Sequence, residues 1–473
     1  MKHADLFPMM RQAALFAALC VAPAVLLGQD LVKGKIIDKV VCAKDPAQSY
    51  ALYVPSDYDP AKKWPVLYAL DPGGRGREPL TRFQDAAEAR GFIVACSYNS
   101  RNGPWEPIFA AAAAVWEDTH ARLAIDDDRV FAAGFSGGAQ AASIFPRMIG
   151  RPIAGVIACG AGLVEGYGVD KLETAAFCGI VGTADFNYRE VMDLDKLLDP
   201  RTDIPHWIRT FDGAHTWSPV PVCTEAMEWL ELAAAKHAGR PPDRALAADL
   251  VAKTAARAAA LEAAGDVFRA VSELDSAVSA FAGIGDAGEL VGIAARLSQT
   301  DTFKRSAKRE AERSRKEDVL LTELYKTLTA IEKTVVLRRN LMEFFSEIDG
   351  LVKDAKKATD VSDKDFARRA LLTVAVDAAD RGGAFLGSKA PAKAVLCFEI
   401  AVRASAHDPA RHTNNLYNLA CANARDGNIR MALDSLRKAV ESGFSDKALI
   451  LRDTDLDTIR DRPEFQEILA NIR

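Results

Sequence analysis

The sequence predicts an α/β fold with a mostly parallel sheet in its first half, followed by an all-α domain. Two observations carry this expectation. Between residues 31 and 240, short runs rich in Val, Ile, Phe and Tyr alternate with segments of helical spacing. Beyond residue 240 the strand signals end, and Ala, Leu, Glu, Lys and Arg recur at helical spacing to the C-terminus.

Eight segments of the first half are predicted strands, and several are apolar throughout, as central strands covered on both faces are. They are residues 31–41, 49–55, 66–71, 92–98, 129–136, 153–160, 177–185 and 206–213. Between them, Ile108–Leu123 and Gly137–Ile149 have the spacing of helices.

Length and composition indicate a globular protein of more than one domain. The chain has 473 residues, of which 49% are hydrophobic and 26% charged, so wholesale disorder is excluded. The net charge of -5 argues against a broad basic surface, and no nucleic-acid partner is expected.

The N-terminus has the pattern of a secretory signal peptide. Lys2 and Arg11 give a basic start, and the apolar run Ala13–Leu27 ends in small residues. We predict a signal peptide over residues 1–28, cleaved near Gly28. The alternative is an uncleaved anchor, but the run is short for a span of roughly 20 residues. The mature protein is therefore expected to be secreted or periplasmic, with no stable membrane insertion.

The Pro-containing break GRPPDR, at residues 239–244, predicts a boundary between a catalytic domain (29–240) and a helical domain (241–473). Within the second half, the offsets of Gly427, Ala432, Leu436 and Ala439 also occur from Gly265 onward. This pattern resembles tetratricopeptide repeats over about residues 365–445, and weakly near 245–280. A generic helical bundle is the alternative for the middle segment. The repeats suggest a protein partner.

Seven cysteines follow the predicted signal peptide, and most lie in apolar runs. None forms a CxxC pair or a Cys/His cluster with zinc spacing. We expect small buried hydrophobic residues, and neither a metal nor an organic cofactor.

The sharpest motif is Gly134-Phe135-Ser136-Gly137-Gly138, which follows a predicted strand and opens a predicted helix. Such a strand-turn-helix corner holds the serine in a strained conformation and exposes its hydroxyl. Only small flanking residues let the strand and the helix pack this tightly. Ser136 is therefore the candidate nucleophile.

A serine nucleophile needs a base, and the base needs an orienting acid. Of the three histidines downstream in the first half, only His215 lies in a loop directly after the last strand. Asp185 ends the preceding strand and is the predicted acid. Asp193, Asp195 and Asp212 compete with it, but the first two fall on a predicted helix and the third is too near His215.

The remaining predicted site residues surround this triad. Gly137, the residue after the nucleophile, is one expected oxyanion donor. Pro72 has no N–H, so Gly73 is the best second donor and Gly74 the next. Three further residues are candidates for substrate contact, although packing or solvent exposure is equally compatible with each of them: Arg75, Trp105 and Trp217.

These pieces, DDDRVFAAGFSGGA (126–139), VGTAD (181–185) and GAHTW (213–217), resemble an α/β-hydrolase. The resemblance is to secreted esterases that include polyhydroxybutyrate depolymerases and feruloyl esterases. Those families usually carry His-Gly in the oxyanion loop, whereas this chain has Asp71-Pro72. The resemblance implies an α/β-hydrolase fold and ester substrates.

The leading hypothesis is an exported serine hydrolase that cleaves carboxylic esters through an acyl-enzyme. Only about sixteen residues, 160–175, separate two strands, so no large lid is expected there and bulky or polymeric esters could enter. The alternatives are a serine peptidase of the same fold, and a helical-repeat interaction protein with an inactive hydrolase scaffold.

Overall fold

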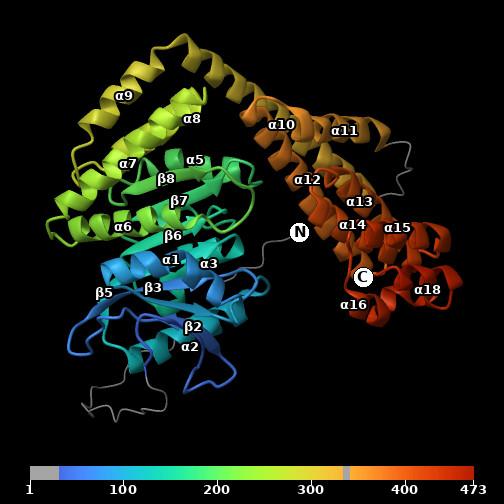
Figure 1. The fold of residues 1–473 in the computed structure, drawn as a ribbon, viewed down its shortest axis with the longest axis horizontal. Coiled ribbons are helices and arrows are strands. Elements are labelled where there is room, and N and C mark those ends of the chain that lie inside the picture. Colours follow the sequence, from blue (N-terminus) through green and yellow to red (C-terminus); the bar gives the residue numbers. More distant parts are fainter. Residues whose placement is uncertain (1–30, 334–340, 473) are drawn as a thin grey trace.

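The computed structural model describes residues 31–333 and 341–472. The predicted signal peptide at residues 1–28 lies outside these ranges. Figure 1 shows a sheet with helices on both sides, and a curved array of helices that begins beside the sheet and ends in a separate stack.

All eight predicted strands are present in one sheet with the order β1-β2-β4-β3-β5-β6-β7-β8. The strands β1 and β2 run antiparallel to their neighbours, and the other neighbouring pairs are parallel. The mostly parallel sheet is thereby confirmed. The bounds are Ile36–Val41 (β1), Ser49–Tyr53 (β2), Trp64–Leu70 (β3), Ile93–Ser97 (β4), Ile125–Phe135 (β5), Gly155–Cys159 (β6), Phe177–Gly182 (β7) and His206–Phe211 (β8).

Helices cover both faces of the sheet, which explains why its central strands are buried throughout. One face packs against α1 (Arg77–Arg90) and α6 (Val220–His237). The other packs against four helices: α2 (Trp105–Arg122), α3 (Gly137–Ser143), α4 (Phe145–Ile149) and α5 (Tyr188–Leu198). The helix predicted over residues 137–149 is interrupted at Ile144, so it forms both α3 and α4. A one-turn 3-10 helix, η1, spans Val169–Lys171.

The first apolar core continues past the predicted boundary at residue 240. It includes residues of α7 (Arg244–Ala263), α8 (Val267–Ala280) and α9 (Gly288–Ser298). Three contacts join α8 and the residue after it to the sheet and α6. The ring centroids of Trp207 and Phe281 lie 5.5 Å apart, Trp229 Nε1 donates to Ala280 O at 3.2 Å, and the Ile208 amide donates to Ser276 Oγ at 2.9 Å. The GRPPDR break ends one helix, yet this core extends to Leu297. The division into domains at residue 240 stays a prediction.

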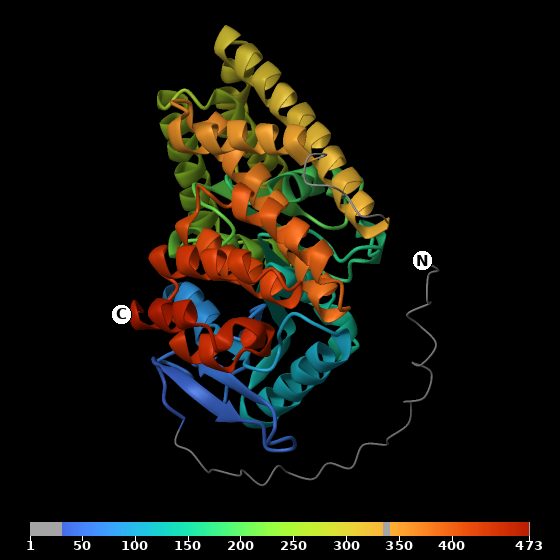
Figure 2. The ribbon, with the colours of Figure 1, turned by 90° about the vertical axis from the view of Figure 1, so that its right-hand side faces the viewer.

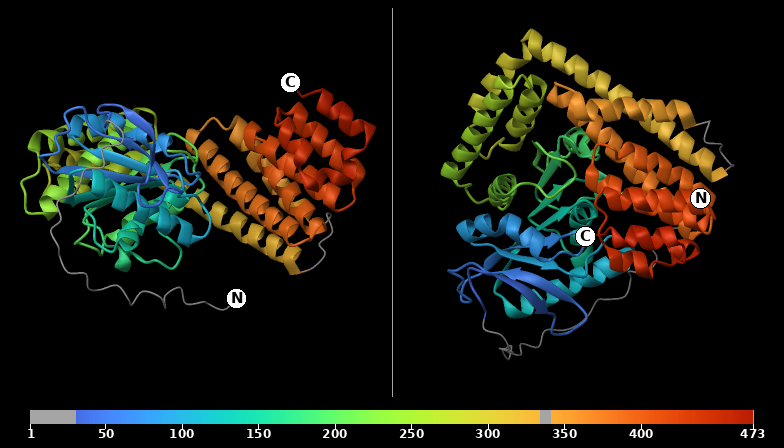
Figure 3. Two further views of the ribbon diagram at one scale, coloured as in Figure 1. Left: turned by 90° about the horizontal axis from the view of Figure 1, so that it is seen from below. Right: turned by 45° about the vertical axis from the view of Figure 1, so that its right-hand side comes forward.

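The second half is helical, as predicted, and extends as a stack beside the sheet (Figures 2 and 3). Small residues at the offsets singled out above are fully buried between neighbouring helices: Ala270 and Ala277 after Gly265, and Ala432 and Ala439 after Gly427. The assignment to tetratricopeptide repeats stays a prediction. The elements are α10 (Asp301–Lys333), α11 (Met342–Lys357), α12 (Val361–Gly387), α13 (Pro391–Ala404), α14 (Pro409–Arg425), α15 (Ile429–Glu441), α16 (Lys447–Arg452), η3 (Thr454–Leu456), α17 (Asp457–Arg460) and α18 (Pro463–Ala470).

The seven cysteines of the described ranges are all buried and unpaired, which confirms the prediction of small buried hydrophobic residues. Burial raises the pKa of these thiols, to about 11 for Cys42 and about 12 for Cys159 and Cys397. Among the same residues, no helix combines the length and the apolar character needed to cross a bilayer.

Candidate active site

Ser136 occupies the sharp corner between β5 and α3. Its backbone has φ 55° and ψ -127°, a region that L-residues rarely adopt and that stores strain. A Cβ on Gly134 would lie 1.9 Å from the Gly138 carbonyl oxygen, and a Cβ on Gly138 would lie 2.1 Å from that of Leu70. Both positions therefore admit only glycine, as the motif predicted.

His215 lies in the loop after β8, and its Nε2 is 2.9 Å from Ser136 Oγ. The imidazole is held between two aromatic rings. Its centroid is 4.6 Å from that of Phe135 and 4.3 Å from that of Phe186. The ring therefore has little freedom to turn away from the serine.

Asp185, in the loop after β7, is fully buried and contacts the other imidazole nitrogen. Its two carboxylate oxygens lie 2.9 and 3.0 Å from His215 Nδ1. The amide of Asn187 also donates to Oδ1, at 2.9 Å. A carboxylate here favours the tautomer with the proton on Nδ1, which leaves Nε2 free to accept a proton from the serine.

The structure thus brings the three predicted triad residues together and places two of the competing aspartates elsewhere. Asp195 accepts a hydrogen bond from Ser276 Oγ, and Asp212 pairs with Arg269. Asp193 lies on α5, as expected from its helical spacing.

The loop after β3 is folded around Asp71, whose side chain is fully buried. Its Oδ1 accepts from the amide of Gly73 at 2.9 Å and from that of Arg75 at 3.1 Å. The Gly74 amide donates to the Asp71 carbonyl at 3.0 Å. The prediction that Gly73 is the second oxyanion donor needs correction, because its N–H is already engaged, and so is that of Gly74.

Arg75 and Trp217 bind the same carboxylate. The Arg75 guanidinium donates through Nε at 2.9 Å and Nη2 at 2.8 Å, and Trp217 Nε1 donates at 2.8 Å. Trp217 is only 3% exposed, so it is a buried link between the β3 and β8 loops rather than a wall of a cleft. Arg75 likewise holds its own loop together. Trp105, which begins α2, packs partly buried against the apolar core.

Opposing effects set the pKa of Asp71. Burial, the largest single effect, raises it. The hydrogen bonds from the Arg75 and Trp217 side chains and from the Arg75 and Gly73 amides together outweigh burial and bring the pKa below its usual 3.8. The charged carboxylate therefore organises this loop, in the place where the resembling families carry His-Gly.

Asn102 is a site residue that the sequence did not reveal. A Cβ on Gly137 would lie 2.1 Å from Asn102 Oδ1 and 3.0 Å from its Nδ2, so the carboxamide occupies the space above Gly137. The Asn102 amide donates to the Pro72 carbonyl at 2.9 Å, which fixes this loop beside the Asp71 loop. Asn102 follows β4 and belongs to no motif, so only its position in the fold reveals it.

Gly137 begins α3, and the first amides of a helix have no partner within the helix. Its N–H is therefore suited to receive an oxyanion that forms beside Ser136. Among the described residues, no cluster of three or more His, Cys, Asp or Glu side chains is arranged to hold a metal ion.

Comparison with solved structures finds serine hydrolases and esterases of the α/β-hydrolase type. FphF, a fluorophosphonate-binding serine hydrolase of Staphylococcus aureus, is 15% identical over 39% of this chain and 92% of its own, with a TM-score of 0.33. Est1E from Butyrivibrio proteoclasticus is 14% identical over 40% of this chain and 95% of its own, also with a TM-score of 0.33. A ferulic acid esterase is 17% identical over 41% and 98%, with a TM-score of 0.30.

No family model matches the sequence, and no curated protein matches it. One fold can support many chemistries, so the reaction has to be inferred from the site itself.

Proposed function

We propose that this protein hydrolyses carboxylic esters with Ser136 as nucleophile, His215 as general base and Asp185 as the orienting acid. The observation that carries the proposal is the continuous hydrogen-bonded chain Ser136 Oγ–His215 Nε2 and His215 Nδ1–Asp185, set on a strained corner. One nitrogen of the imidazole contacts a buried aspartate and the other contacts the serine hydroxyl. This arrangement activates a serine.

The reaction has two halves. Ser136 Oγ attacks the ester carbonyl carbon while His215 takes the hydroxyl proton, and the proton then passes to the departing alkoxide, leaving an acyl-serine. Water repeats the attack with His215 as base, which releases the carboxylic acid and restores the serine. Asp185 keeps the imidazole oriented and stabilises its positive charge in both halves.

The carbonyl oxygen becomes an oxyanion in each tetrahedral intermediate and needs hydrogen-bond donors. The Gly137 amide is one donor in this proposal. The second is Asn102 Nδ2, because the carboxamide lies against Gly137 while the Gly73 amide is bonded to Asp71.

A fluorophosphonate probe tests the nucleophile directly. We expect labelling of the full chain at Ser136, and loss of ester hydrolysis by about 10⁴- to 10⁶-fold in Ser136→Ala. Ser143→Ala is the matched control, because this buried serine ends the helix that follows Ser136 and donates to the backbone carbonyls of Ala139 and Gln140. Near-normal ester turnover by Ser136→Ala would refute the mechanism.

An ester panel of graded chain length, with a feruloyl ester, a polyester and a set of peptides, then defines the substrate. Hydrolysis of esters alone fits the proposal, and preferential hydrolysis of peptides favours the peptidase alternative. A wild-type chain that neither labels nor turns over any substrate favours the inactive scaffold.

Export of the chain after cleavage near residue 28 is part of the same proposal, and it rests on the sequence. N-terminal sequencing of the secreted protein tests it. A mature chain that still carries Met1 would refute cleavage.

A further inference from the structure

The segment that carries Asp185, from Thr183 into the first turn of α5, contacts the helical half through three residues. Thr183 Oγ1 donates to Asp365 Oδ2 of α12 at 2.7 Å. The Arg369 guanidinium of α12 lies 4.6 Å from the centroid of the Tyr188 ring. Arg189 Nη1 pairs with Asp318 Oδ1 of α10 at 2.6 Å. All three contacts fall within four residues of the triad acid.

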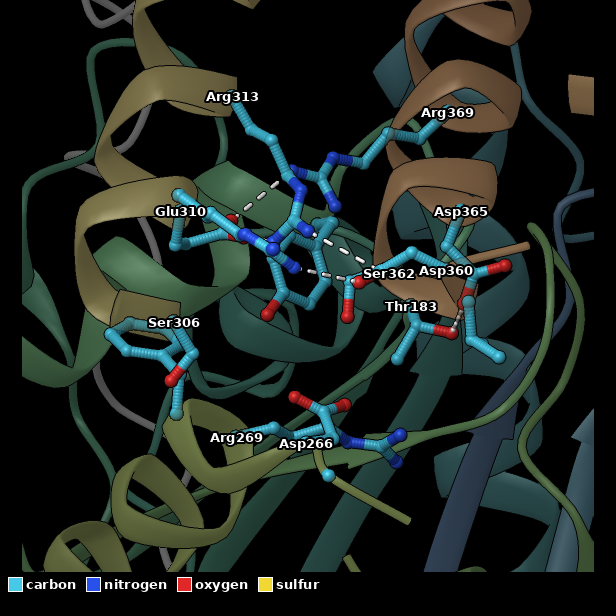
Figure 4. A pocket seen from close by; sticks show the side chains of 15 residues that line it. Thr183, Asp266, Arg269, Ser306, Glu310, Arg313, Asp360, Ser362, Asp365 and Arg369 are labelled. Atoms are coloured by element: carbon cyan, nitrogen blue, oxygen red, sulfur yellow. Dashed lines mark hydrogen bonds and ion pairs between the residues drawn. The ribbon is translucent and has the colours of Figure 1, made fainter. Parts of the chain in front are cut away.

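Figure 4 shows this seam between the two halves, with Thr183 and Asp365 facing each other. Thr183, Tyr188 and Arg369 are buried there, and the Asp365 side chain is only 14% exposed. A hydrogen bond shielded from water in this way is stronger than one on the surface.

Hydrogen bonds within the loop hold it together, so a displacement at either end would also move Asp185. The Tyr188 amide donates to the Asp185 carbonyl at 3.0 Å, and the Asn187 amide donates to its carboxylate at 2.9 Å. Asn187 Nδ2 also donates to the Gly160 carbonyl at 2.7 Å. Displacement of Thr183 or Tyr188 would therefore move the carboxylate that holds His215.

We propose that Asp365, on the helical half, is a positioning residue for the active site: its hydrogen bond to Thr183 fixes the loop that presents Asp185 to His215. Asp365 touches no reacting atom and acts only through Thr183 and Asp185. The helical half would then contribute to catalysis, because its position beside this loop would affect kcat. This inference rests on the proposed ester hydrolysis.

The test compares the full chain with Asp365→Ala and Thr183→Val. Each variant removes one end of the hydrogen bond, and each is expected to lower kcat about fivefold with KM unchanged, as a lost bond of ordinary strength allows. The double variant should lose no more than either single variant. Asp365→Asn keeps an acceptor oxygen and should retain most of the wild-type kcat.

The control is Asp349→Ala. Asp349 is a carboxylate of α11 that binds Arg403 of α13 at 2.7 Å, within the helical half and outside the seam. The Asp349→Ala variant should leave kcat unchanged. In an Asp185→Ala background, Asp365→Ala should have no further effect, because the residue through which it acts is gone.

Hydrogen exchange provides a second readout that does not depend on activity. The amides of residues 183–185 and 187–188 are all hydrogen-bonded. Asp365→Ala should speed their exchange, and Asp349→Ala should not. If both readouts of Asp365→Ala match those of Asp349→Ala in an active enzyme, the positioning role is overturned. A wild-type chain without esterase activity or probe labelling would instead refute the proposed function.

Discussion

Cutting the chain at residue 240 should destabilise the sheet, because the sheet is completed by helices that come later in the sequence. The fragment 31–240 loses α8, which covers the edge strand β8. Trp207 and Trp229 are 1% and 0% exposed in the full chain, and both lie against residues 280–281. The Ile208 amide loses its acceptor, Ser276 Oγ.

The cost can be worked from these contacts. Uncovering a large apolar side chain costs about 2 kcal/mol, and there are two such tryptophans. Loss of the hydrogen bond at the strand edge costs about 1 kcal/mol more. The total of about 5 kcal/mol equals the lower end of the free energy of unfolding of a whole domain.

The assay compares 31–240 with 31–300, which retains α7, α8 and α9, by size-exclusion chromatography and thermal melting. We expect 31–300 to be monomeric, and 31–240 to aggregate or to melt at least 10 °C lower, because 1 kcal/mol corresponds to about 2–4 °C at this size. A monomeric 31–240 that melts within about 5 °C of 31–300 would show that the α/β part does not need these helices.

Three further outcomes are expected. Asn102→Ala should lower kcat about 100-fold with little change in KM, as loss of one oxyanion donor does, and an unchanged kcat would remove Asn102 from the site. The low pKa of Asp71 stabilises the fold above about pH 4, and this contribution is lost as the pH falls through the lower native pKa. The difference in melting temperature between wild type and Asp71→Asn should therefore be widest at pH 7 and narrow below pH 4; an equal difference at both would contradict this account. In a chain that begins at residue 31, the seven buried thiols should react with a thiol reagent only after unfolding, and rapid reaction of the native chain would contradict their burial.

The strands, and the corner that carries Ser136, could be predicted because local sequence determines them. Apolar runs bounded by turn residues are sufficient to place buried parallel strands. The glycines around Ser136 predict the corner, and a side chain at Gly134 or Gly138 would collide with backbone atoms. Asp185 and His215 could then be chosen because each lies in a loop that directly follows a predicted strand.

Contacts between side chains or helices that lie far apart in the sequence could not be predicted. The sequence favours Gly73 as an oxyanion donor, but a motif cannot show that the Asp71 carboxylate folds back and accepts the hydrogen bond of the Gly73 N–H. Trp217 is a candidate for substrate contact by sequence, but its ring N–H donates to the same buried carboxylate, a contact that no motif reveals. The GRPPDR break marks the end of a helix, but it does not reveal that the apolar core beside the sheet continues into α7 and α8.

The bond between Thr183 and Asp365 also bears on the order of events as the protein folds. It joins positions separated by 182 residues, and closing so long a loop is slow compared with forming a helix or a neighbouring strand pair. On refolding from denaturant, helical circular dichroism should return first, and the proposed ester hydrolysis should recover fully only later, when α12 packs against the loop after β7 and the start of α5. A folding intermediate in which α12 has not yet packed would contain Ser136, His215 and Asp185 and would still be a poor catalyst.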